Sequence, residues 1–90
     1  MNQALQAVVH DIAKLDDSGV IDGVSHHRLE FELHGGEFRI NGNRTGLIRF
    51  ARQVLQVAAK ELPGSHAHLD EANGLDRVDM AVVICLKCTE

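Results

Sequence analysis

The stretch from Gly46 to Asp70, GLIRFARQVLQVAAKELPGSHAHLD, decides the fold. Its first part repeats apolar residues at helical spacing, with arginine, glutamine and lysine between them, which predicts an amphipathic helix. Pro63 and Gly64 should end that helix, because proline cannot continue it and glycine frees the chain to turn. From His66 onward, apolar and polar residues alternate, which predicts a short strand. The segment therefore predicts a helix and a strand that share one core.

Upstream of this stretch, two alternating segments flank Gly35 and Gly36 and predict a β-hairpin over residues 29–34 and 37–41. Paired glycines suit a two-residue turn, because such turns need positive φ angles. The turn fixes the register, and a slip of one residue would lose every match. Apolar residues and unlike charges then face each other across the strands. The expected pairs are Leu33 with Phe38, Phe31 with Ile40, Glu32 with Arg39, and His34 with Glu37.

Further elements complete a single α+β domain over residues 1–90. Helical spacing predicts a helix over residues 3–17, and Asn43 or Thr45 should cap the central helix. Residues 79–87, DMAVVICLK, are apolar on both faces, which is typical of an interior strand. The order α-β-β-α-β-β then predicts a four-stranded, mostly antiparallel sheet with both helices packed on one face. The expected core is Leu29, Phe31, Leu33, Phe38, Ile40, Leu47, Phe50, Val54, Leu55, Ala58, Leu69, Val82 and Ile84.

Composition argues against several classes of function. The chain has 13 acidic and 9 basic residues, a net charge of −4, three phenylalanines and no tryptophan or tyrosine. Nucleic-acid binding is therefore disfavoured, since it needs a basic surface and often stacking aromatics. No apolar run approaches the ~18 residues of a membrane span. The first residues also lack the basic start of a signal peptide, so we expect a cytoplasmic protein and no membrane partner.

Three potential metal ligands lie on one side of the expected strand after the helix. His66, His68 and Asp70 share a face because strand side chains alternate. A His-x-His pair on a strand suits zinc, iron or nickel, with Asp70 as a third ligand. His34 or Cys85 could complete such a site if the strands are neighbours. The ordinary alternative is the polar outer face of a half-exposed strand, and that alternative needs no cofactor.

The remaining chemistry-bearing residues do not predict an enzyme. Cys85 and Cys88 are spaced as a redox or zinc pair, yet they end a strand, whereas redox pairs usually open a helix. Two thiols at the edge of the core are the simpler interpretation. The sequence identifies no nucleophile with a neighbouring base and a group to orient it.

The C-terminal half resembles a known family. The runs G-L-x3-A-x2-V-L-x-V-A and G-S-H-A-H-L-D, then a Gly74-Leu75 turn and an apolar strand, are similar to a small immunity-protein family of bacterial polymorphic toxin systems. The resemblance begins at Gly46 and leaves out the N-terminal helix. It implies a protein that binds and neutralises a cognate toxin made by the same cell. Its most specific element consists of Gly64, His66, His68, Leu69 and Asp70.

The leading hypothesis is thus a protein-binding domain, an immunity protein, and the alternative is a metal-binding domain that uses the His-x-His-x-Asp strand. The net acidity suits a basic toxin. A homodimer is also expected, since the N-terminal helix could pair with a second copy and small domains gain stability by association. The partner should bind the sheet face that points away from the central helix. The expected contact residues are Glu30, Glu32, His34, Arg39, His66, His68, Asp70 and Val83.

Overall fold

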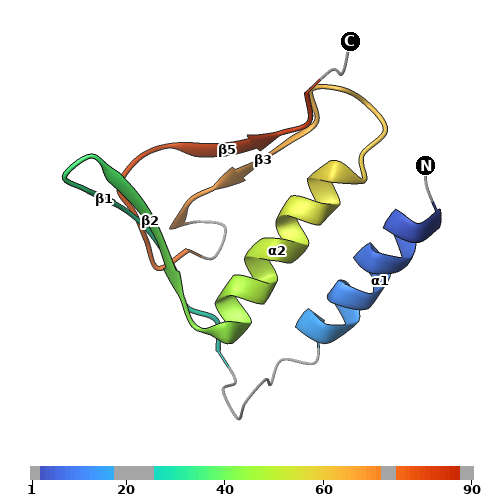
Figure 1. Cartoon of the computed structure of the whole chain (residues 1–90), viewed down its shortest axis with the longest axis horizontal. Coiled ribbons are helices and arrows are strands. Elements are labelled where there is room, and N and C mark those ends of the chain that lie inside the picture. The colour runs from blue at the N-terminus through green and yellow to red at the C-terminus, as the bar shows by residue number, and fades with distance from the viewer. Residues whose placement is uncertain (1–2, 18–25, 72–74, 88–90) are drawn as a thin grey trace.

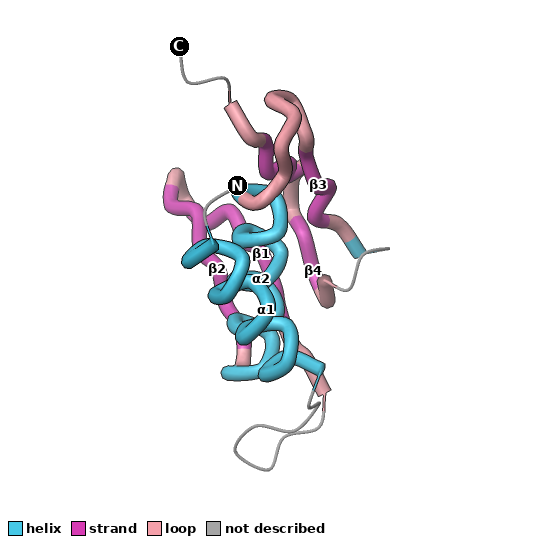
Figure 2. Tube along the Cα trace, turned by 90° about the vertical axis from the view of Figure 1, so that its right-hand side faces the viewer, coloured by secondary structure: helices cyan, strands magenta, loops and turns pink. Residues whose placement is uncertain are grey.

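The computed structural model describes residues 3–17, 26–71 and 75–87. Two helices, α1 (Gln3–Asp17) and α2 (Arg44–Ala58), lie side by side, with the strands on the far side of α2 (Figure 1). Seen from the side, α1 stands in front of α2 and the strands lie behind it (Figure 2). The predicted helix over residues 3–17 is confirmed. It packs mainly against α2, so the expectation that both helices cover one sheet face is wrong.

The strands form two sheets rather than the single four-stranded sheet that the sequence led us to expect. The first sheet has the order β2-β1-β4, and the second contains β3 and β5. Helix α2 contacts members of both sheets and is therefore the centre of the fold. The strands are β1 (Leu29–His34), β2 (Glu37–Gly42), β3 (His66–Leu69), β4 (Arg77–Val78) and β5 (Val82–Cys85).

The hairpin of β1 and β2 has the predicted register. Gly35 and Gly36 both have positive φ angles, 54° and 87°, as a two-residue turn requires. All four expected pairs are present, from His34 opposite Glu37 at the turn to Phe31 opposite Ile40. Complementary side chains and a short glycine turn therefore suffice to set this pairing.

Strand β4 was not expected, because the sequence pattern predicted no strand between the one after the central helix and residues 79–87. It is only two residues long and pairs in parallel with β1. Asp76 and Asp79 stand on either side of it and extend its hydrogen bonds with their side chains. The Asp76 carboxylate accepts from the backbone N–H of Leu29 at 2.7 Å, and that of Asp79 accepts from Leu33 at 3.0 Å. Because side-chain oxygens replace part of the ladder, the strand is too short to show an alternating pattern.

Since β4 occupies the second edge of β1, the last strand pairs elsewhere. It runs from Val82 to Cys85, shorter than the expected 79–87, and pairs antiparallel with β3. His66 lies opposite Cys85, and His68 lies opposite Val83. The expectation of an interior strand is wrong, since the second sheet has two strands and Val83 is 44% exposed.

The core is smaller than expected. Among the described residues the buried apolar side chains are Leu29, Phe31, Val57, Leu69 and Leu75, with Phe50, Val82 and Ile84 partly buried against them. The expected core residues that prove to be exposed are Leu33, Phe38, Ile40, Leu47, Val54 and Ala58. Phe38 and Ile40 are exposed because β2 is the outer strand of its sheet, and Leu47, Val54 and Ala58 lie on positions of α2 that neither α1 nor the strands bury. Val57 was missed because α2 packs against α1 as well as the strands and so buries more than one stripe.

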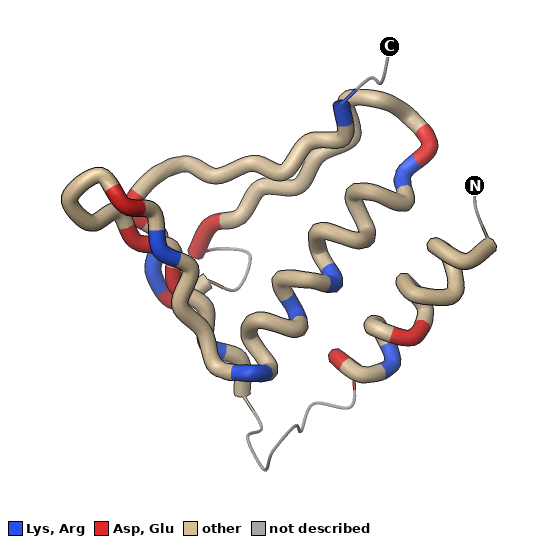
Figure 3. The backbone as a smooth tube through the Cα atoms, viewed as in Figure 1, with Lys and Arg blue, Asp and Glu red and all other residues tan. Residues whose placement is uncertain are grey.

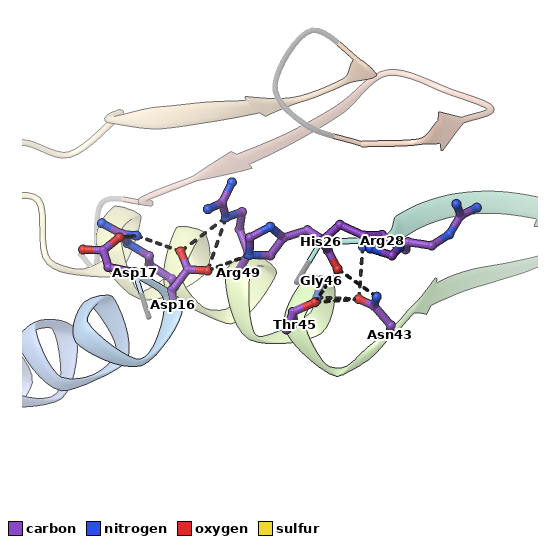
Figure 4. Close-up of polar contacts among 10 residues, drawn as sticks. Asp16, Asp17, His26, Arg28, Asn43, Thr45, Gly46 and Arg49 are labelled. Atoms are coloured by element: carbon purple, nitrogen blue, oxygen red, sulfur yellow. Dashed lines mark hydrogen bonds and ion pairs between the residues drawn. The ribbon is translucent and has the colours of Figure 1, made fainter. Parts of the chain in front are cut away.

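The start of α2 is anchored to the start of β1. Asn43, one of the two predicted candidates, is the N-cap, and its side-chain oxygen accepts from the backbone N–H of Gly46 at 2.8 Å. The same oxygen accepts from the N–H of Arg28 at 3.0 Å, and the Thr45 hydroxyl donates to the carbonyl of His26 at 2.8 Å (Figure 4). The bond from Gly46 satisfies one of the donors that a helix leaves unpaired at its first turn, and the other two tie the cap to the chain before β1. They also fix the direction in which α2 leaves the hairpin.

Candidate functional site

The predicted contact residues fall into two groups. We call Glu30, Glu32, His34 and Arg39 the hairpin face, since all four belong to β1 or β2. We call His66, His68, Asp70 and Val83 the histidine face, since they belong to β3 and β5 or directly follow β3. Because the two groups belong to different sheets, the expectation of a single continuous sheet face is wrong.

Two residues of the histidine face, His66 and His68, border a groove beside the helices. His66 and His68 are exposed, and their rings meet edge to face with centroids 5.0 Å apart. Both border a groove of about 650 Å³ that also reaches Val9 of α1 and Gln53 and Gln56 of α2. On the opposite side of β3, Leu69 belongs to the core against which Phe50 of α2 packs, and the direction of the histidines relative to the central helix stays a prediction.

The geometry does not support the metal-binding alternative. His66 and His68 share a face, as predicted, but Asp70 lies beyond the end of β3. Across residues 3–17, 26–71 and 75–87, no three His, Cys, Asp or Glu side chains are grouped so that they could hold a metal ion. Cys85 is an exposed free thiol opposite His66, and Cys88 lies outside the described residues.

The hairpin face carries carboxylates that are partly neutralised by arginines. Arg77 of β4 donates to Glu32 at 2.9 Å and to Asp79 at 3.0 Å, and Arg39 pairs with Glu37 at 2.7 Å. Hydrogen bonds from the Arg77 side chain and the Leu33 backbone hold the pKa of Asp79 below its ordinary value. These contacts fix the orientation of the charged side chains on the outer side of the first sheet.

A buried carboxylate at the end of α1 joins the two helices (Figure 4). Asp16 is 3% exposed, and its oxygens accept from Arg52 at 2.7 Å and from Arg49 at 3.3 Å. His27 lies 3.1 Å away and forms a further hydrogen bond, and Arg52 also binds Asp17. From the sequence alone, Asp16 and Asp17 were simply the last two residues of the predicted helix over residues 3–17.

The spacing of residues along the two helices indicates the contact between Asp16 and the arginines of α2. Residues Leu5, Val9 and Ile12 form the half-buried stripe of α1, and Asp16 is the next position on the same face. Arg49 and Arg52 lie three residues apart and therefore on one face of α2. A stripe of one helix that ends in an acid, with two arginines on a neighbouring helix, favours a buried ion pair.

This ion pair makes stability depend on pH. Burial raises the pKa of Asp16, but hydrogen bonds and positive charge from Arg52, Arg49 and His27 outweigh it and hold the pKa below its ordinary value. The stabilisation is therefore fully present above the ordinary aspartate pKa of about 4 and is lost as the pH falls through the folded-state value. We expect Asp16→Asn to cost about 1–2 kcal/mol at neutral pH, as its arginine partners are partly exposed.

Thermal melts of wild type and Asp16→Asn at several pH values test this prediction. The difference between their melting temperatures should shrink below the ordinary aspartate pKa. Asp17→Asn is the matched control, because that side chain is 67% exposed and its loss should matter little. A difference that stays constant from neutral to acid pH would contradict the assignment.

A comparison with known protein families shows to which family this chain belongs. The family model described as Immunity protein 32 matches residues 37–87, more than half of the chain. The chain belongs to the Immunity protein 32 family. The match runs from the start of β2 through β5 and leaves out α1 and β1. A search of the curated proteins and a search of the solved structures found no match.

Membership in the Immunity protein 32 family confirms the resemblance to immunity proteins that the sequence suggested. The matched region holds the whole histidine face, and of the hairpin face it holds Arg39. Among the described helices, none is long and apolar enough to cross a membrane.

Proposed function

We propose that this protein is a cytoplasmic immunity protein that binds a cognate toxin and neutralises it without catalysing a reaction. Membership in the Immunity protein 32 family is the observation that carries the proposal. The charged and apolar residues of the hairpin face and the histidine face support a role in binding. In this proposal, the toxin contacts the hairpin face and the histidine face.

The distribution of charge favours a basic partner for the hairpin face. Helix α2 carries three arginines and no acidic residue, whereas the whole chain has 13 acidic and 9 basic residues. The acidic surplus therefore belongs to the rest of the molecule, including the first sheet (Figure 3). An acidic surface speeds the encounter with a basic protein, and salt weakens this effect.

The histidine face offers a different kind of contact. Val83 is 44% exposed and lies opposite His68, so an apolar side chain borders two imidazoles. Protein interfaces commonly combine an apolar centre with polar residues around it. The histidine face would therefore supply apolar contact with the toxin, while the hairpin face would supply long-range electrostatic attraction.

The experiment is co-expression with the toxin encoded next to its gene, together with binding kinetics on the purified pair. Glu30→Lys should slow association about tenfold at low salt and flatten its salt dependence, since it reverses a charge on the hairpin face. Val83→Arg should mainly speed dissociation and reduce protection of the cell. Asp11→Lys on the exposed surface of α1 is the control with the same change of charge as Glu30→Lys.

Two results would contradict this proposal in different ways. If wild type neither binds the toxin nor protects the cell, the function is wrong. If Glu30→Lys and Val83→Arg both fold and bind like Asp11→Lys, the function stands but these two faces are not the interface.

A further inference from the structure

A large apolar surface is exposed where β2 meets α2. The ring of Phe38 packs edge to face on Phe31 with centroids 5.8 Å apart, and Phe31 packs on Phe50 of α2 at 5.4 Å. Leu47 of α2 lies against the end of β2, where a side chain at Gly42 would come within 3.3 Å of it. We call this surface the open flank. It consists of Leu33, Phe38, Ile40, Leu47 and Val54, which are 38% to 56% exposed.

The open flank borders a strand edge that pairs with no other strand among the described residues. β2 is the outer strand of its sheet, and all six of its residues are exposed. In an antiparallel hairpin, backbone groups point alternately toward the partner strand and away from it. With His34 and Glu37 as the pair that closes the turn, the N–H and C=O groups of Phe38 and Ile40 point away from β1. An open edge beside an apolar surface is a template for a further strand.

The dimensions of the molecule agree with an incomplete core. Its radius of gyration is 14.1 Å, whereas a compact chain of this length has a radius of about 12 Å. The shortest dimension is only 21 Å. Exposed apolar patches on proteins commonly mark sites of interaction, so the open flank favours a partner that covers it.

We propose that the cover is a second copy of this chain, which adds its own β2 antiparallel to the first. With Phe38 opposite Phe38 of the second copy, Glu37 faces Arg39 of the other chain, and the symmetry repeats this pair. The strand is therefore complementary to itself in charge. A register centred on Arg39 would set two like charges opposite each other, and one centred on Ile40 would form no pair of opposite charges. A shift of one residue would bring polar side chains against apolar ones.

This pairing joins the two three-stranded sheets into one six-stranded sheet. Because the two-fold axis is perpendicular to the sheet, both α2 helices lie on the same side of it. The open flanks then meet between these helices, and Leu47 and Val54 of each copy border the shared groove. The side chain of Arg39 lies on the outer side of the sheet, and the other residues of the hairpin face stay accessible in the dimer. The dimer therefore goes beyond the proposed function and is compatible with it.

Light scattering after size exclusion, over a range of protein concentrations, tests the dimer. Wild type should approach twice the 9.9 kDa mass of one chain, and its melting temperature should rise with concentration. Ile40→Lys should be monomeric, because it places a charge in the shared groove. Val83→Lys is the matched control, since Val83 is also a strand residue of similar exposure, 44% against 41% for Ile40, and it should remain dimeric.

A charge exchange tests the register independently of whether Ile40→Lys folds. Arg39→Glu alone should weaken the dimer about tenfold or more, because two attractive pairs become repulsive. Adding Glu37→Arg to the same chain should restore the wild-type dissociation constant. A wild type that is monomeric at every concentration, a dimer insensitive to Ile40→Lys, or a failure of the double variant to recover would each overturn the proposal.

Discussion

A Phe31→Ala variant should lose about 3–5 kcal/mol of unfolding free energy, a large share of the stability of a domain this small. Phe31 is 1% exposed and stands at the centre of the core, with Phe38 on one side and Phe50 on the other. Removing the ring costs the burial of its surface and also leaves a cavity among side chains from β1, β2 and α2. Chemical denaturation, monitored by circular dichroism, measures the loss.

The matched control for Phe31 is Leu33→Ala, two residues along the same strand and on the same face. Leu33 is 56% exposed, so its truncation should cost about 1 kcal/mol or less. Both variants should be compared with wild type at one protein concentration, because association would add to the stability. Equal losses for the two variants would show that Phe31 is not the centre of the core.

Gly46→Ala should be destabilising by about 3 kcal/mol or more, although alanine normally favours a helix over glycine by about 1 kcal/mol. A Cβ atom at Gly46 would come 1.9 Å from the carbonyl oxygen of Arg28 and 2.7 Å from its carbonyl carbon. Both atoms are backbone, so no change of rotamer relieves the contact. Arg28 is also held in place by Asn43 through two hydrogen bonds. The helix start or its cap must therefore move.

Gly35→Ala is the control for this second prediction. Its Cβ would meet nothing within 4 Å, so the variant bears only the cost of a positive φ angle, about 1–2 kcal/mol. Thermal and chemical denaturation of the two variants should rank Gly46→Ala well below Gly35→Ala. If Gly46→Ala is instead as stable as wild type, α2 does not begin against Arg28.

The parts of the fold that the sequence predicted are those set by neighbouring residues. The hairpin register follows from Gly35, Gly36 and the pairs beside them, and the cap at Asn43 follows from the local chemistry of a helix start. Alternation also grouped His66 with His68 and Phe31 with Leu33 correctly. It identifies which side chains share a face, but it does not reveal whether another element covers that face. Phe31 and Leu33 share a pattern and differ completely in burial.

The parts that were missed depend on residues far apart in the sequence. β4 exists because Asp76 and Asp79 bind the backbone of β1, whereas the sequence pattern assigned Asp76 to no element and placed Asp79 at the start of the last strand. The burial of Asp16 depends on two arginines of another helix. For the candidate site, the sequence indicated the immunity-protein family. The prediction of a single sheet, however, placed the hairpin face and the histidine face on one surface, whereas they belong to two sheets.

The central position of β1 limits where this protein can be divided into fragments. Strands β2 and β4 both pair with β1, yet the family match begins only after it, at residue 37. A fragment limited to the match would lose the ladder partner of two strands at once, together with Leu29 and Phe31 from its interior. The cap of α2 reaches still further upstream, to the carbonyl of His26. We therefore expect the smallest folding unit to be longer than the family match, and a transplant or fusion of this domain to need a boundary that precedes His26.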